Sequence, residues 1–143
     1  MTLIVCCYTP TGIALSGDSR TTSVRGQQVA VPNAPAGTAP IVVQIPWILS
    51  DNARKVFSLH ERFAVATWGE AFLNGLPIAH HINEFAIGTT SAQFPTTSQF
   101  ADGLLAYFTG LAPALGIGFV VAAYDGKDPF VFEVNVGSNS VKR

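Results

Sequence analysis

The chain has 143 residues and a mass of 15.1 kDa, the size of one compact domain. Eight basic and nine acidic residues give a formal net charge of −1, which excludes the basic surface of a nucleic-acid-binding protein or of one bound to an anionic membrane. Charged residues make up only 12% of the chain, against about 25% in an average soluble domain. We therefore expect one face to be buried by partner subunits or by further chain.

No stretch of the sequence reaches the roughly 20 apolar residues that a membrane-spanning helix needs. No lysine or arginine precedes Arg20, so we expect no signal peptide. Cys6 and Cys7 are the only cysteines, and neighbouring residues of a strand point to opposite faces. They form no disulfide framework, and we expect a cytoplasmic location.

The first predicted elements are two strands. Leu3–Tyr8 is apolar throughout and predicts a buried strand, and Ile13–Gly17 predicts its hairpin partner across the turn Thr9–Gly12. Residues 21–50 are rich in proline, alanine and threonine and are interpreted as an insertion loop, with a strand at Ile41–Ile45.

The rest of the chain predicts two hairpins with a helix pair between them. Four strands are expected, at Lys55–Leu59, Phe63–Thr67, Ile117–Tyr124 and Phe130–Val136. Helical spacing of apolar residues covers 70–86, where Pro77 starts or kinks the helix, and a second helix follows the N-cap candidates at 96–98. This order favours an α+β layered sandwich over a doubly wound parallel sheet.

A candidate nucleophile stands at position 2. Removal of Met1 would leave Thr2 with a hydroxyl and a free α-amine in one residue. An α-amine has a pKa of about 7.7–8.0, so it can act as a base near neutral pH. Threonine at position 2 is also common without any function, so the residue needs partners before it indicates a site.

Hairpin geometry supplies one partner. If the turn is a bulged type I turn, Thr9 pairs with Ile13, and Thr2 then shares a face with Asp18 at about 7–8 Å. A two-residue loop would turn Asp18 away. Lys55 could lie between Thr2 and Asp18, held charged by the carboxylate. Alternatively, Asp18 caps a strand end and Lys55 is a solvated residue at the start of a strand.

Gly69 is the last candidate, at the end of the strand that includes Thr67 and Trp68. A backbone N–H at that point could bind an oxyanion. A plain strand-to-helix turn is the alternative. His80 and His81 have no second pair of ligands at metal-binding spacing, and we expect neither a metal nor a cofactor.

Four segments together resemble the β subunits of the proteasome and the bacterial HslV peptidase, which are N-terminal nucleophile (Ntn) hydrolases. These are residues 2–5 (TLIV), 17–20 (GDSR), 54–56 (RKV) and 66–69 (ATWG). The resemblance implies a four-layer αββα sandwich, of which the chain would cover about the first two-thirds. It also implies Thr2 as nucleophile, Asp18 orienting Lys55, Lys55 tuning the proton of the nucleophile, and the Gly69 N–H stabilising the oxyanion.

The resemblance further implies a threonine-type peptidase in a homo-oligomeric ring that acts on peptides or unfolded protein, and it leaves an ATPase partner open. The interval from Asp18 to Lys55 is about twenty residues longer than in the family, and Ser138 would be a family site residue only if the segment 137–140 were more than a plain turn. A non-catalytic scaffold subunit and a small-molecule amidohydrolase of the same superfamily are the competing hypotheses.

Overall fold

The computed structural model describes residues 3–29, 39, 41–50 and 53–143. The chain divides into two compact units. The first, called the body here, consists of Met1–Asp18 and Arg54–Arg143, and the second, called the arm, is Ser19–Ala53.

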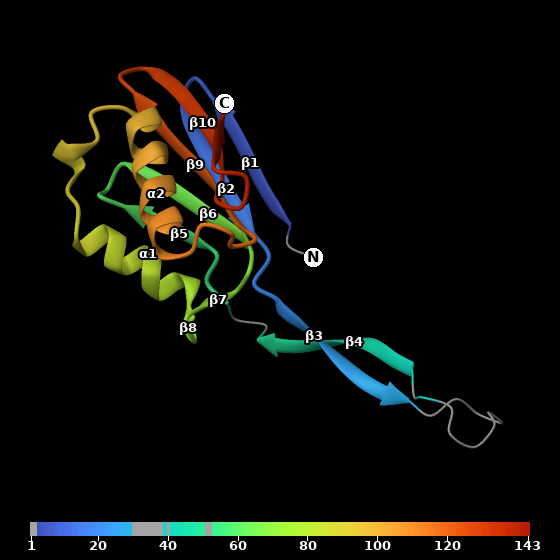
Figure 1. Cartoon of the computed structure of the whole chain (residues 1–143). Coiled ribbons are helices and arrows are strands. Elements are labelled where there is room, and N and C mark those ends of the chain that lie inside the picture. Colours follow the sequence, from blue (N-terminus) through green and yellow to red (C-terminus); the bar gives the residue numbers. More distant parts are fainter. Residues whose placement is uncertain (1–2, 30–38, 40, 51–52) are drawn as a thin grey trace. The chain divides into compact units, whose positions relative to one another are not determined.

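A five-stranded antiparallel sheet forms the centre of the body (Figure 1). Its strand order is β11-β10-β9-β6-β5. The strands span Val56–Leu59 (β5), Phe63–Gly69 (β6), Ile117–Asp125 (β9), Asp128–Asn135 (β10) and Ser140–Lys142 (β11). The two hairpins predicted from residue 55 onward are confirmed, and β11 is an addition that the sequence did not indicate.

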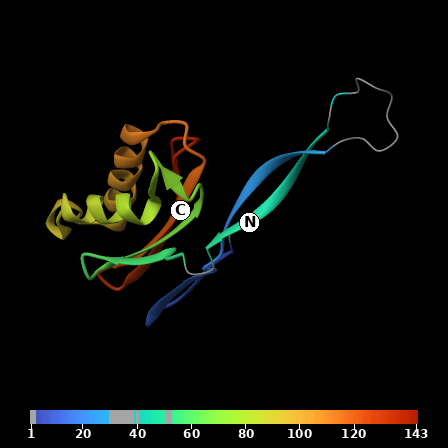
Figure 2. The ribbon, with the colours of Figure 1, turned by 90° about the horizontal axis from the view of Figure 1, so that it is seen from below.

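Both α-helices of the described residues lie on one face of this sheet (Figures 1 and 2). Helix α1 spans Ile78–Ile87 and α2 spans Thr97–Leu111. Their apolar faces and the facing side of the strands form one core, whose largest fully buried members are Phe57, Phe63, Phe100, Phe108, Phe119, Ile82 and Leu104. Neither described helix has the length and apolarity needed to cross a membrane.

The helix boundaries follow local signals. Pro77 is the N-cap of α1, so the prediction that Pro77 starts the helix is confirmed, whereas the predicted start at Glu70 is wrong. The residues before it form a small hairpin of β7 (Phe72–Leu73) and β8 (Leu76–Pro77). Thr96 caps α2 as predicted and accepts a hydrogen bond from the Gln99 N–H.

A second hairpin covers part of the opposite face of the sheet (Figures 1 and 2). It consists of β1 (Ile4–Thr9) and β2 (Gly12–Gly17). The expectation of a buried first strand is wrong, because Leu3, Val5 and Tyr8 are 64%, 46% and 62% exposed. Val5 and Cys7 are exposed whereas Ile4 and Cys6 are half-buried, so alternate residues of this part of β1 point away from the sheet. Tyr8 is exposed although it belongs to the same set as Ile4 and Cys6.

The predicted four-layer αββα sandwich is wrong. The described body has three layers: one pair of helices, the five-stranded sheet and the two-stranded hairpin, with antiparallel strands predominating. The segment between β6 and β9 carries both helices, and β9 pairs directly beside β6. Both helices therefore cross the same face, and the order of elements alone did not reveal this.

The arm is an antiparallel pair of β3 (Thr21–Val29) and β4 (Ile41–Ser50). The predicted strand at Ile41–Ile45 is confirmed and continues to Ser50. The prediction of loop over residues 21–29 is wrong, because β3 occupies them. The placement of this segment as an insertion relative to a family stays a prediction.

Candidate functional site

Asp18 and Lys55 form an ion pair at one end of the body. The Lys55 ammonium donates to Asp18 Oδ1. The side chain of Lys55 is only 10% exposed and that of Asp18 is 33% exposed. The other carboxylate oxygen, Oδ2, accepts the Leu3 N–H at 3.0 Å. The carboxylate thus joins the lysine to the backbone of the residue that follows Thr2.

Two contacts fix the position of Lys55. Its carbonyl accepts the Thr67 N–H at 2.9 Å, which continues the β5–β6 ladder by one residue. The end of β2 packs directly on it, because a Cβ built at Gly17 would lie 3.7 Å from Lys55 Cβ and 3.6 Å from Val56 Cγ2. The Cβ of Lys55 therefore lies against the end of β2, and its ammonium reaches Asp18.

Gly69 ends β6 at the same end of the sheet, where β5 begins. In an extended strand, successive N–H groups point to opposite sides. The Thr67 N–H points toward β5 and donates to the Lys55 carbonyl. The Glu70 N–H points toward β9 and donates to the Gly116 carbonyl at 3.0 Å. Gly69 departs from the extended conformation and lies beyond the last hydrogen bond of the ladder with β5.

Glycine is required at this position. Gly69 has a φ of +93°, and a Cβ there would lie 2.1 Å from the Gly116 carbonyl oxygen. Positive φ disfavours other residues, and the close approach of β9 excludes a side chain. The backbones of Gly69 and Gly116 therefore lie close together at the end of β6.

The structure reaches the Asp18–Lys55 contact by a route other than the predicted one. Thr9 pairs with Gly12, and the loop has two residues, so the predicted pairing of Thr9 with Ile13 is wrong. The last ladder pair is Ile4–Gly17. Asp18 lies just beyond it, so strand alternation does not dictate the direction of its side chain. Thr2 lies outside the described residues.

Other candidates are not brought to this site. The segment around Ser138 is a turn between β10 and β11, in which Asn135 Oδ1 accepts the Ser138 N–H and the Ser138 hydroxyl contacts that of Ser140. The strand β10 is three strands away from β5, about 14 Å in the sheet. The interpretation of residues 137–140 as a plain turn after the strand is confirmed.

The histidines have contacts within the fold. Buried His81 hydrogen-bonds the Leu73 carbonyl through Nε2 at 3.0 Å, and His60 contacts the Thr89 hydroxyl. No group of three metal-ligating side chains occurs in the part of the chain that the structure describes.

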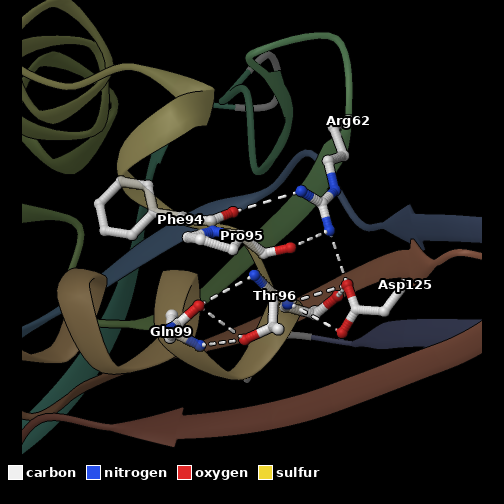
Figure 3. A network of polar contacts seen from close by, with 7 residues as sticks. Arg62, Phe94, Pro95, Thr96, Gln99 and Asp125 are labelled. Carbon is white, nitrogen blue, oxygen red and sulfur yellow. Dashed lines mark hydrogen bonds and ion pairs between the residues drawn. The ribbon is translucent and has the colours of Figure 1, made fainter.

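A second ion pair, between Arg62 and Asp125, was not found from the sequence (Figure 3). The Arg62 guanidinium reaches Asp125 Oδ1 at 2.8 Å and also donates to the carbonyls of Phe94 and Pro95. Asp125 accepts both the backbone N–H and the hydroxyl of Thr97, the first residue of α2. The network fastens the start of α2 to the ends of two sheet hairpins.

Burial of Asp125 opposes its ionisation, but the hydrogen bonds from Thr97 and the charge and hydrogen bond of Arg62 outweigh it. The pKa of the Asp125 carboxyl is therefore lowered from its ordinary value. Its position at the N-terminus of α2 adds a favourable interaction between the carboxylate and the helix dipole. Every part of this network serves to hold the helix in place.

Comparison with known proteins adds no assignment to this geometry. No protein-family model matches the sequence, and no curated protein does. The resemblance to Ntn hydrolases accordingly stays a prediction. What the sheet end offers chemically is a carboxylate and an ammonium in contact, a backbone amide held by that carboxylate, and the backbone of Gly69 where β6 ends.

Proposed function

We propose that this chain is a threonine-type peptidase in which Thr2, exposed by removal of Met1, is the nucleophile. The observation that supports the proposal is the partly buried Asp18–Lys55 pair whose carboxylate also binds the Leu3 N–H. A carboxylate in this position fixes both the lysine charge and the backbone next to Thr2. A scaffold would not need a lysine desolvated in this way.

The proposed reaction is acyl transfer through an ester. The Thr2 hydroxyl oxygen attacks the carbonyl carbon of a peptide, and its proton passes to the free α-amine of the same residue. The amine returns the proton to the departing amino group as the C–N bond breaks. Water then attacks the ester, which releases the carboxylic acid and regenerates Thr2. The positive charge of Lys55 favours deprotonation of the Thr2 hydroxyl to the alkoxide during attack.

Gly69 would stabilise the tetrahedral intermediate. It lies at the end of β6 beyond the last hydrogen bond with Lys55, and oxyanion holes are built from backbone donors that are fixed before the reaction. The narrow contact between Gly69 and Gly116 fixes the backbone there, so the donor needs no reorganisation.

The experiment combines intact mass with hydrolysis of a fluorogenic peptide. Active material is expected to lack Met1, and Thr2→Ala is expected to abolish turnover, whereas Thr11→Ala in the exposed first turn keeps it. Retention of Met1 in active protein would overturn the mechanism, because the α-amine of Thr2 would then be an amide. Parent activity in Thr2→Ala would overturn the assignment of the nucleophile.

The same measurement distinguishes the competing functions. A non-catalytic scaffold predicts no hydrolysis in any variant, since the ion pair would then serve only to fix β2 on β5. A small-molecule amidohydrolase predicts turnover of short amides that depends on Thr2, without turnover of peptides. Our proposal includes a homo-oligomeric assembly in the cytoplasm, in line with the free thiols of Cys6 and Cys7 and the low charge content.

A further inference from the structure

We propose that the arm is a self-association device: the free edge of β4 over Ile41–Ile45 pairs with the same edge of a second copy and forms a four-stranded sheet. This inference names a contact for the homo-oligomeric assembly of the proposed function and does not depend on the peptidase activity. It rests on the strand pairing, exposure and charge content of the arm.

The arm lacks the layers that normally stabilise a sheet. Among the described residues, β3 and β4 pair only with each other. A two-stranded hairpin is marginally stable in water, whereas three or more strands with an apolar face can be stable. Pairing two arms through β4 supplies the missing strands.

The exposed side chains of β4 are suited to strand pairing. Ile41, Val42 and Val43 are 53%, 58% and 39% exposed. Since successive residues of a strand face opposite sides, apolar side chains are exposed on both faces of the arm. They are β-branched, the type that packs well across strands. The described side chains of β3 opposite this segment include Gln27 and Gln28, which leaves β4 as the apolar edge.

Charge favours a second copy as the occupant. No charged residue occurs from Gly26 to Ser50. Natural edge strands are commonly blocked by lysine or other charges, and like charges directly opposite each other destabilise a strand pair. An uncharged edge meets its own copy without repulsion, and a two-fold axis makes the two contributions identical. Pro46 lies beyond the proposed segment, so its missing N–H does not interrupt the pairing.

The test uses the full chain and sedimentation equilibrium, with two arm variants. One carries Ile41→Lys, Val42→Lys and Val43→Lys, and the other carries Ile41→Glu, Val42→Glu and Val43→Glu. We expect the parent to self-associate and each variant to dissociate about tenfold more readily or worse. Mixing the two variants should restore association, because opposite charges then face each other. Ile87→Lys, at a 79% exposed site on α1, is the control and should behave like the parent.

Three outcomes would overturn the proposal. A monomeric parent at the highest concentration tested would remove self-association altogether. Parent-like association in both arm variants would place the contact elsewhere in the chain. Two monomeric variants that fail to associate when mixed would show that the arm docks on something other than another arm. Near-ultraviolet circular dichroism, which reports the aromatic core of the body, shows that the body of each variant is folded, and restored association on mixing shows that the arm is.

Discussion

Two partly buried ion pairs among the described residues of the body differ in what surrounds them. Arg62 and Asp125 are linked to a helix start, a turn carbonyl and a proline carbonyl, and these contacts all stabilise the position of α2. Lys55 and Asp18 instead lie where β2, β5 and β6 end or begin, and the carboxylate binds the backbone beside Thr2. One pair has an evident structural task, whereas the other is placed where chemistry could occur.

The difference shows why a buried ion pair alone does not mark a site. Breaking either pair leaves a desolvated charge. Only the neighbours separate the two roles: caps and carbonyls around Arg62, a strand end and the N-terminal segment around Lys55. Variants of the two pairs should therefore differ in which property they change, activity or stability.

The largest expected effect is on activity, from Lys55→Ala. Loss of a positioned group that assists proton transfer typically costs about 10²–10⁴ in rate. Lys55→Arg should fail as well, because the planar guanidinium does not replace the compact ammonium that contacts Asp18 Oδ1. Initial rates on a fluorogenic peptide, with urea denaturation of the same samples, measure both properties.

Lys127→Ala is the control, at an exposed lysine in the β9–β10 turn, and should keep the parent rate. A folded Lys55→Ala protein with the parent rate would remove Lys55 from the mechanism and favour the scaffold function.

The second prediction concerns stability, through Asp125→Ala. The substitution removes the acceptor of the Thr97 N–H and hydroxyl and leaves the fully buried Thr97 side chain without it. Because the pair keeps some solvent access, we expect a loss of about 2–3 kcal/mol in the free energy of unfolding. Urea denaturation measures it, and activity per folded molecule should stay at the parent level.

Asp128→Ala, at an exposed aspartate three residues further along the same hairpin, is the matched control and should be close to neutral. Equal losses in the two variants would show that the network contributes little to stability.

The contrast between local and distant contacts also explains what could be read from the sequence. The hairpin around His60, the strands before and after Gly126 and the cap at Thr96 depend on neighbouring residues, and they were predicted. Pairing of β6 with β9 joins segments about fifty residues apart, and the arrangement of the layers depends on that pairing. No periodicity encodes such a contact, and the predicted sandwich was wrong for that reason.

The candidate site shows the same limit. Asp18 and Lys55 could be named from residue type and position, but the register used to join them was wrong because the turn after Thr9 has two residues. Strand β3 was missed because glycine, threonine and glutamine dominate a segment that pairs well only with the apolar β4. Arg62 and Asp125 are 63 residues apart, and the one signal for them was an acidic residue at a strand end in a charge-poor chain.

The third prediction is an acid sensitivity that arises from Asp125. The folded-state pKa of this carboxyl lies below its ordinary value of 3.8, so its contribution to stability is complete above that value and is lost as the pH falls through the folded-state pKa. The stability advantage of the parent over Asp125→Asn should therefore shrink below about pH 4. Urea midpoints of both proteins between pH 7 and pH 3 measure this advantage. An advantage that stays constant down to pH 3 would contradict the ionised role of Asp125.

A smaller effect is expected from Thr96→Ala at the start of α2. Thr96 accepts the Gln99 N–H, and the Gln99 side chain binds the Thr96 N–H in return, so the substitution removes one of several terminal contacts. Loss of a threonine cap costs about 1 kcal/mol. The Asp125 carboxylate still binds the Thr97 N–H, so the first turn of the helix keeps an acceptor and the loss should stay below that of Asp125→Ala.

Thr90→Ala is the matched comparison, because Thr90 precedes a three-residue 3₁₀ turn and its N–H is likewise accepted by the side chain three residues on, that of Gln93. A turn that short contains few backbone hydrogen bonds, and the expected loss in the free energy of unfolding is a few tenths of a kcal/mol. The predicted order of urea midpoints is therefore Thr90→Ala above Thr96→Ala above Asp125→Ala. If Thr96→Ala proved as damaging as Asp125→Ala, the helix start would depend on its own cap, and the Arg62–Asp125 pair would lose the structural role that separates it from Lys55 and Asp18.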